Sequence, residues 1–356
     1  MKRCKRCVMP STVPGISFNE VGVCNYCQSY QPESYLGEKE LCRIMEYARG
    51  KRSVYDCIVP ISGGRDSTYV LFMAKSLLGL KTLAVNYDNE FAPPYAMANI
   101  KRACETLNVD FVSVRSKRAY VRKIAKHSIM AATEFGQFRE CAGCTYGYRS
   151  VVYRKAKEFG IPLILWGESR EEATAEMERK AFEVIRQHKL KYLKLLRKEF
   201  YAAEFYRLLQ RAEFFVSWRN VLSRRFDPIF KTNNIKEIRV FDYIPWERKK
   251  IKETIMNELG WEKPADVAST WKADCVMVGL TNFYYMMLFG CTKLCFGYTR
   301  MINGGQMERE EALIQEENML VSYSKGLKEI LEDHIGLSKE HANRILSYRG
   351  RRCLTE

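Results

Sequence analysis

A strand, a glycine-containing turn and the start of a helix follow one another at residues 57–75, and this order constrains the fold more than any other feature. The run Cys57–Ile61 is apolar like a buried strand, and the segment after the turn is rich in helix-forming residues. The turn, Ser62–Thr68, reads Ser-Gly-Gly-Arg-Asp-Ser-Thr. Glycines let a backbone approach a phosphate closely, and a helix N-terminus adds unpaired N–H groups. The sequence therefore predicts an anion-binding loop, the alternative being an ordinary glycine–serine turn.

Strand-like and helix-like segments go on alternating after this loop. Short apolar runs predict strands at 82–87, 109–114 and 161–166, and amphipathic patterns predict helices at 94–107, 117–132 and 146–159. Such alternation is typical of an α/β fold with a doubly wound, mostly parallel sheet. Ligands of these sheets bind beyond the carboxyl ends of the strands. The predicted site therefore gains the residues at two further strand ends: Asn86, Tyr87, Asp88, Gly167 and Glu168.

Three carboxylates in these segments each allow two interpretations. Asp66 and Asp88 suit a magnesium ion, because this cation prefers oxygen ligands and shares them with substrate phosphates. Asp66 would alternatively cap the helix that is expected to begin near Ser67. Glu168 would orient a substrate or a metal ion, or belong to a simple surface turn.

Two C-x-x-C pairs near the N-terminus, Cys4/Cys7 and Cys24/Cys27, are separated by sixteen residues. This spacing predicts one tetrahedral zinc ion held by four thiolates, as in a zinc ribbon. A site with four protein ligands has no open position, so its role would be structural. It would replace a hydrophobic core that so short a segment cannot build. The alternative is four unrelated free cysteines.

A third C-x-x-C pair, Cys141/Cys144, stands between two predicted helices and ahead of the strand at 161–166. One such pair alone is a weak signal, because it fits a zinc knuckle, a redox pair or two buried thiols. Its position predicts that it faces the mouth of the anion site, and Cys275 is a credible third ligand. We interpret the three cysteines as ligands of a second metal ion or cluster, with a thiol-based sulfur relay or plain burial as alternatives.

Composition and charge favour a globular protein with an anionic partner. The 356 residues are 47% hydrophobic and carry a formal net charge of +16. This excess of lysine and arginine suits nucleic acid, nucleotides or anionic sugars, although a solvated basic face would give the same charge. The sequence has no apolar run of membrane-spanning length and no signal-peptide core at its start. A cytoplasmic protein without a membrane partner is therefore expected.

The loop also carries a family resemblance, since Ser62 to Ser67 match the S-G-G-x-D-S motif of the PP-loop ATP pyrophosphatases. Members of this group cleave ATP between the α- and β-phosphates and pass the adenylyl group to a substrate oxygen. The resemblance implies the adenine nucleotide alpha-hydrolase-like fold, catalytic roles for Asp66 and Ser67, and adenine against the strand-end backbone near Asn86. It also implies a set of residues that hold ATP: Ser62, Gly63, Gly64, Arg65, Asp66, Ser67 and Thr68.

Other segments are similar to the N-acetyl sugar amidotransferase family of lipopolysaccharide and surface-sugar biosynthesis. They are 6–18 and 22–27 around the cysteine pairs, Trp166–Ser169, and 303–312, where Asn303 replaces the arginine of an R-x-G-x-M-x-R-E-E-A signature. The chain lacks the tyrosine-glycine-glycine that follows the tryptophan strand in that family. The resemblance implies an amidotransferase that adenylates the N-acetyl group of a nucleotide-linked sugar. Ammonia from a separate glutaminase would then displace AMP.

The trio Cys141, Cys144 and Cys275 resembles instead the PP-loop tRNA thiolases, whose three thiolates hold an iron–sulfur cluster with one open iron. On this interpretation the chain is a sulfurtransferase that uses a [4Fe-4S] cluster or a thiol relay to thiolate tRNA or a small molecule. A third possibility is a nucleotide-binding regulator or scaffold that binds ATP and releases no pyrophosphate. The amidotransferase is the leading expectation, because its family motifs occur at both ends of the chain.

Four segments are expected along the chain. Residues 1–32 would form the zinc-binding module, and residues 33–170 the nucleotide-binding core. A helical insert is expected at 171–240, since residues 171–225 contain no proline or glycine and are dense in charged and aromatic side chains. It would grip an anionic substrate, cap the site or dock another protein. Residues 241–356 would form an α-rich region that completes the core.

Overall fold

The computed structural model describes residues 2–51, 53–115, 120–135, 141–169, 177–178, 181, 234–265, 267, 269–322 and 326–347. Most of the insert that the sequence predicts at 171–240 lies outside the described residues. Within the described parts of the chain, no helix is long and apolar enough to cross a lipid bilayer.

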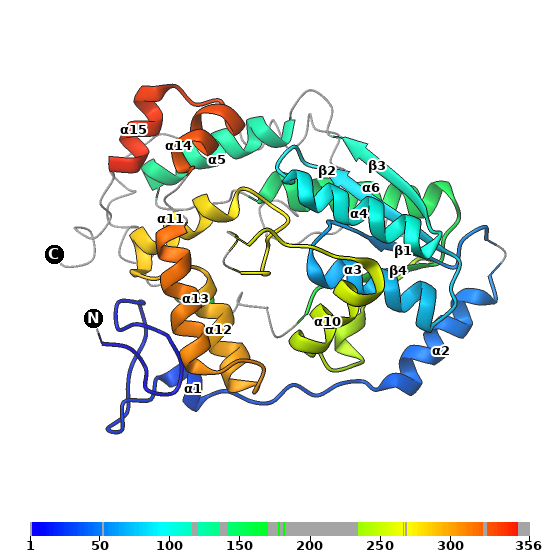
Figure 1. Ribbon diagram of the computed structural model, residues 1–356, viewed down its shortest axis with the longest axis horizontal. Helices are drawn as coiled ribbons and strands as arrows, with labels where there is room; N and C mark the ends of the chain where they lie inside the picture. Colours follow the sequence, from blue (N-terminus) through cyan, green and yellow to red (C-terminus); the bar gives the residue numbers. More distant parts are fainter. Residues whose placement is uncertain are drawn as a thin grey trace.

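Five parallel strands form the central sheet, in the order β3-β2-β1-β4-β5 (Figure 1). Ile58 of β1, for example, lies between Leu83 of β2 and Ile164 of β4. The doubly wound parallel sheet that the sequence predicts is therefore confirmed. The strands are β1 (Cys57–Pro60), β2 (Thr82–Asp88), β3 (Asp110–Arg115), β4 (Leu163–Trp166) and β5 (Lys236–Arg239).

The strand order reverses between β1 and β4, and this reversal fixes where a ligand can bind. The chain proceeds from β1 to β2 and β3 on one side, and then returns to add β4 and β5 on the other. The connections of the two central strands leave in opposite directions, which opens a crevice at their carboxyl ends. The loop Ser62–Thr68 follows β1 and Gly167 follows β4, so both segments stand at this reversal.

Helices cover both faces of the sheet, because side chains alternate between the faces along each strand. Val59 and Leu165 belong to a core that includes α3, α4 and α10, whereas Ile58 and Ile164 pack with α6 on the opposite face. The helices predicted at 94–107 and 146–159 and, over its described part, at 117–132 are confirmed. The helices of this region are α2 (Glu38–Arg49), α3 (Arg65–Phe72) with its continuation η1 (Met73–Leu77), α4 (Pro94–Leu107), α5 (Tyr120–Phe135), α6 (Ala142–Glu158) and α10 (Arg248–Leu259).

The edge strand β5 differs from the sequence prediction. Its residues, Lys236–Arg239, fall inside the segment predicted as a helical insert, yet they pair with β4. Only Ile238 in this strand is buried, so no apolar run marks the strand in the sequence. The sheet therefore resumes before residue 241, where the C-terminal region was expected to start.

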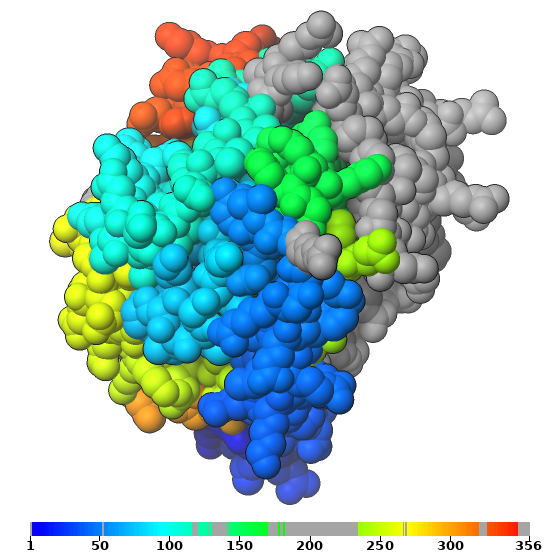
Figure 2. All heavy atoms as spheres, turned by 90° about the vertical axis from the view of Figure 1, so that its right-hand side faces the viewer, coloured from blue at the N-terminus to red at the C-terminus, as the bar shows by residue number. Residues whose placement is uncertain are grey.

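The N-terminal module lies beside α12 (Leu294–Asn303) and α13 (Arg309–Ser322) (Figure 1). Helix α1 contacts α12, and the side view shows the module, in dark blue, at the lower end of the molecule below α2 (Figure 2). The last helices, α14 and α15, pack with α5 and α11 in a separate hydrophobic cluster around Leu280 and Leu331. The remaining elements are α1 (Asn25–Gln28), η3 (Val240–Asp242), α11 (Val278–Phe289), α12 (Leu294–Asn303), α13 (Arg309–Ser322), α14 (Leu327–Glu329), η4 (Ile330–His334) and α15 (Lys339–Ser347).

Candidate nucleotide-binding site and metal centre

The turn after β1 has the backbone that close approach to a ligand requires. Gly63 adopts φ +80°, and a Cβ there would overlap with the backbone carbonyl of Ala96 in α4. Both facts favour glycine. Residues with a side chain avoid positive φ, and the main-chain atoms of Ala96 cannot move aside for a Cβ as a flexible side chain could. The indole N–H of the buried Trp261 donates to the Gly63 carbonyl at 2.9 Å. The loop is thus held between two distant segments of the chain.

The loop meets the end of β4 at the reversal point of the sheet. A Cβ on Gly167 would lie 3.0 Å from the Ser67 amide nitrogen and 3.1 Å from the Asp66 carbonyl oxygen. Gly167 therefore lets the two strand ends approach each other at the N-terminus of α3. The exposed hydroxyl of Ser62 lies 3.1 Å from that of Ser67, whose side chain accepts from the Ser62 amide. Hydroxyls and first-turn amides consequently gather at one place.

Arg65 and Asp66 are engaged with each other inside the protein. The Arg65 side chain is only 3% exposed and donates two hydrogen bonds to the Asp66 carboxylate, at 2.9 and 3.0 Å. The guanidinium also lies over the Trp246 ring at 4.7 Å and donates to Thr270, and the Trp246 indole donates to Asp66. Such a buried pair is stable only when its donors and acceptors are satisfied, as they are here.

The helix α3 begins earlier than the sequence suggests. Gly64 is its N-cap residue, and no side chain caps the helix. The expectation that Asp66 caps a helix starting near Ser67 is therefore wrong. The reason is the buried pair with Arg65, which draws the Asp66 carboxylate away from the first-turn amides.

The end of β2 supports the loop from its other side. Asn86 is buried and donates to the carbonyl of Ile61, directly before the loop, at 2.8 Å. Asp88 accepts from Arg115 at 2.7 Å, and the ring of Tyr87 lies so close to Gly147 of α6 that any Cβ there would overlap with it. The side chain of Asn86 thus shapes the loop, while the backbone after it borders the crevice.

Glu168, after β4, is held by two side chains of α6. Arg149 donates to its carboxylate at 2.9 Å, and the Tyr148 hydroxyl lies at 3.2 Å. The Arg149 guanidinium in turn lies over the Trp166 ring at 4.7 Å. These contacts fix the position of Glu168, although 44% of its side chain is exposed to solvent. Glu168 therefore differs from a residue of an unconstrained surface turn.

The structure brings Cys141, Cys144 and Cys275 into one region. Cys141 is the exposed N-cap residue of α6, and Cys144, in the first turn, accepts a hydrogen bond from Asn89 at 3.1 Å. Burial raises the pKa of Cys275, and the charges of Cys141 and Cys144 raise it further. Such electrostatic coupling requires proximity. Within the described residues, however, only the N-terminal quartet has all ligand atoms within 4.8 Å of one another.

One residue of this region was not foreseen from the sequence. A Cβ on Gly64 would lie 3.1 Å from Oδ2 of Asp274, so this carboxylate rests on the tip of the loop. The Ser62 hydroxyl oxygen lies 3.3 Å from the same point, so it and the carboxylate stand beside Gly64, while burial raises the pKa of Asp274. The Tyr95 hydroxyl, which donates to the carbonyl of Ala273, anchors the segment. The only sequence signal was the adjacent Cys275, which gives no indication of contact with the loop.

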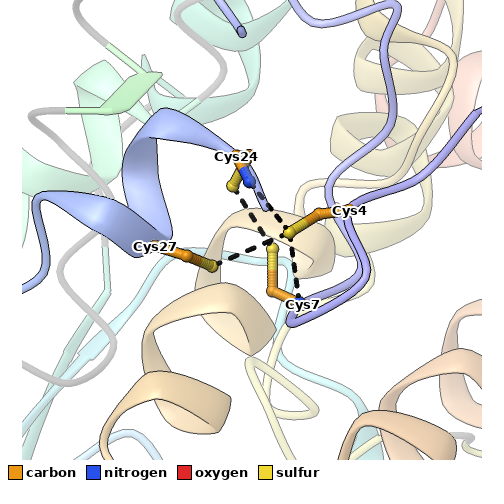
Figure 3. Close-up of side chains that lie close together, drawn as sticks. All are labelled: Cys4, Cys7, Cys24 and Cys27. Carbon is orange, nitrogen blue, oxygen red and sulfur yellow. Dashed lines mark hydrogen bonds between the residues drawn. The ribbon is translucent and has the colours of Figure 1, made fainter. Parts of the chain in front are cut away.

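The N-terminal cysteines form a compact four-sulfur cluster. Cys4, Cys7, Cys24 and Cys27 point toward one another from two knuckles (Figure 3) and are all buried. The Cys4–Cys27 sulfur distance is 3.9 Å and the Cys7–Cys24 distance is 3.7 Å. A zinc ion with bonds of about 2.3 Å in a tetrahedron would set its sulfurs about 3.8 Å apart. The cluster therefore has the donor set and the spacing that one zinc ion needs.

Backbone hydrogen bonds converge on one thiol of the cluster. The amides of Arg6, Cys7 and Cys24 donate to the Cys4 sulfur at 3.2 to 3.4 Å. The Cys7 side chain and these amides lower the pKa of Cys4 to about 6, whereas neighbouring thiols raise the pKa of Cys7 and Cys27. A thiol with a lowered pKa gives up its proton readily, which favours a metal thiolate.

The segment 303–312 surrounds this cluster. Asn303 donates to the Cys27 sulfur at 3.2 Å. Arg309 donates to the carbonyls of Cys7, at 3.0 Å, and Cys4, at 3.3 Å. The motif that resembles the amidotransferase signature therefore contacts the knuckles directly, and it joins the N-terminal module to α12 and α13.

Replacing Asn303 with alanine is expected to weaken metal binding by about 10-fold to 100-fold, the usual cost of losing a hydrogen bond to a metal ligand. Competition with a chromophoric zinc chelator would measure this change. Gln28→Ala is the matched control, because Gln28 belongs to the same module but donates to a backbone carbonyl. Equal zinc affinities for the two variants would contradict a role of Asn303 at the cluster.

Comparisons with known proteins identify solved structures of similar fold at low sequence identity. No family model and no curated protein sequence matches the chain. The fold is similar to that of NMN synthetase from Francisella tularensis, with 12% identity and a TM-score of 0.38 over 84% of this chain and 94% of the other. It is similar to the U34-tRNA thiolase NcsA from Methanococcus maripaludis, with its [4Fe-4S] cluster, at 15% identity and a TM-score of 0.36 over 87% and 90%.

A third similar structure is the NH3-dependent NAD synthetase from Campylobacter jejuni. Its identity is 13% and its TM-score 0.29, over 49% of this chain and 93% of the other. At such distances the residues of this chain, rather than the similarities, have to support a functional assignment.

Proposed function

We propose that this chain is an ATP-dependent adenylating enzyme of the PP-loop pyrophosphatase type. The observation that carries the proposal is the loop Ser62–Thr68 at the reversal point of the sheet. There Gly63 allows close backbone approach, and the hydroxyls of Ser62 and Ser67 gather at the start of α3. This arrangement suits a chain of phosphates.

In the proposed reaction an acceptor oxygen attacks the α-phosphorus of ATP, and pyrophosphate leaves. The loop amides and the Ser67 hydroxyl hold the phosphates in line and stabilise the negative charge that develops on them. Magnesium, when bound, would neutralise part of that charge. Arg65 and Asp66 contribute by fixing the loop, because each is engaged with the other. Gly167 lets the end of β4 pack closely against the first turn of α3 beside Ser67.

The leading candidate for the second step is an amidotransferase reaction. Ammonia attacks the carbon of the N-acetyl group whose oxygen carries the adenylyl group. The bond between this carbon and that oxygen breaks, AMP leaves, and an amidine forms. The support is the resemblance of segments 6–18, Trp166–Ser169 and 303–312 to the N-acetyl sugar amidotransferases. The acceptor would then be a nucleotide-linked sugar, and a separate glutaminase would supply the ammonia.

The position of three cysteines supports a second candidate, a sulfurtransferase. Burial and the charges of Cys141 and Cys144 raise the pKa of Cys275, which directly follows Asp274 beside Gly64 of the loop. Their three sulfurs do not all lie within 4.8 Å of one another, as the sulfurs of the N-terminal quartet do. A wider spacing suits a cluster of several irons, because such a cluster holds its thiolates farther apart than a single ion does. When bound there, a [4Fe-4S] cluster would supply an open iron for a sulfur atom. The acceptor would be tRNA or a small molecule.

One set of measurements tests both candidates. The protein would be purified anaerobically, analysed for zinc, iron and acid-labile sulfide, and assayed for AMP and pyrophosphate with each acceptor and nucleophile. Dependence of product on a nucleotide-linked N-acetyl sugar and ammonia, with no iron, would support the amidotransferase. Iron and sulfide that disappear in Cys141→Ala but remain in Cys42→Ala, an exposed cysteine of α2, would support the sulfurtransferase. ATP binding without pyrophosphate release would indicate a regulator, and failure to bind ATP would refute the whole proposal.

A further inference from the structure

Asp274 brings a carboxylate to a loop whose backbone is built for anions. The segment around it comes from the C-terminal region, some 200 residues after the loop in the sequence. Its Oδ2 lies 3.1 Å from the point where a Cβ of Gly64 would stand, and the Ser62 hydroxyl oxygen lies 3.3 Å from the same point. The carboxylate is therefore directly at the N-cap of α3.

This position is unfavourable for ATP binding unless a cation is also present. A carboxylate and a phosphate chain a few ångströms apart repel each other, and the repulsion is strong where both are shielded from water. A divalent cation between them turns the repulsion into attraction, because it shares oxygen ligands from protein and phosphate. Asp274 thus makes physical sense at the loop as a ligand of the cation that accompanies the nucleotide.

The two carboxylates that the sequence proposed for magnesium are held by cationic partners. Both oxygens of Asp66 accept hydrogen bonds from Arg65, and one of them also accepts from Trp246. Asp88 accepts from Arg115. Asp274, in contrast, stands beside Gly64 together with the Ser62 hydroxyl, and a hydroxyl oxygen is itself a ligand that magnesium accepts. The charge of Lys272 also acts on Asp274, but its ammonium lies over the Trp271 ring at 5.0 Å.

We propose that Asp274, which stands beside Gly64 and Ser62, is the protein ligand for the divalent cation of magnesium–ATP at this loop. The proposal rests on the binding of ATP put forward above. It assigns the cation to a residue of the C-terminal region, so that this region completes the nucleotide site.

Calorimetric titration of ATP tests the proposal, in magnesium chloride and separately in magnesium-free buffer without a chelator, so that the N-terminal cluster keeps its metal, for wild type, Asp274→Asn and Asp110→Asn. In wild type, magnesium should tighten ATP binding by about tenfold or more, which corresponds to about 1.4 kcal/mol. Asp274→Asn should lose this gain, yet bind ATP more tightly than wild type in magnesium-free buffer, because the repelling charge is gone. Asp110, exposed at the start of β3, is the control for removal of one negative charge, and its variant should behave as wild type.

The other possible results contradict either the role of Asp274 or the binding of ATP itself. If Asp274→Asn keeps the full gain from magnesium, or loses ATP binding in both solutions while its thermal unfolding is unchanged, the proposal is wrong. If wild type binds no ATP in either solution, the proposed function itself fails. Should Asp274→Asn not fold, Asp274→Ser, which is smaller and leaves room for a water molecule, would repeat both titrations with the same expectations.

Discussion

Replacing Gly63 with alanine is expected to abolish ATP binding and to lower the free energy of unfolding by several kcal/mol. The φ angle of +80° alone costs a non-glycine residue about 1–2 kcal/mol. The larger effect comes from the new Cβ, which would overlap with the carbonyl oxygen and Cα of Ala96. These atoms are main chain in the first turn of α4, so relief requires a shift of the loop or of the helix.

Gly326→Ala separates the two contributions. Gly326 has nearly the same φ, +78°, but no atom lies within 4 Å of where its Cβ would stand. Urea unfolding should show only the conformational cost for Gly326→Ala and a clearly larger loss for Gly63→Ala. ATP titration should show normal binding for the control. Equal losses of stability in the two variants, with ATP binding retained, would mean that the loop is not pressed against α4.

The elements around the loop could be predicted because their signals are local. The bounds of α4, for example, are those expected, since Pro94 stands at its first turn and Asn108, with φ +48°, ends it in the left-handed conformation. The strand, glycine turn and helix at 57–72 were predictable for the same reason. Propensities, positive φ and apolar runs are properties of neighbouring residues.

The partners of the loop could not be predicted, because they come from distant parts of the chain. Trp246 and Trp261 donate to Asp66 and to Gly63 across nearly 200 residues, and nothing in their own surroundings indicates this. Arg65 illustrates the consequence, since its motif position suggested a phosphate contact, whereas its side chain is buried against Trp246. The contact of Asp274 with the loop could not be predicted for the same reason.

Removing the metal of the N-terminal cluster is the second change for which we expect a large effect. Structural zinc contributes about 10–16 kcal/mol of apparent binding free energy in small modules, and most of it is folding free energy. About 1 kcal/mol corresponds to a change in Tm of roughly 2–4 °C in chains of about 150–250 residues, and to somewhat less in a longer chain such as this one. Cys24→Ala, or a strong chelator, should therefore lower Tm by more than about 10 °C. Cys42→Ala, the same substitution at an exposed site on α2, should leave Tm unchanged.

The loss should extend beyond the knuckles, because the cluster is joined to the C-terminal helices. Asn303 and Arg309 bind it directly, and the Tyr298 hydroxyl of the same helix α12 donates to Gln315 of α13. Metal removal should therefore destabilise α12 and α13 together with the module. Zinc content and Tm, measured on the same samples, would check this. An unchanged Tm after complete zinc removal would show that the module folds without its metal.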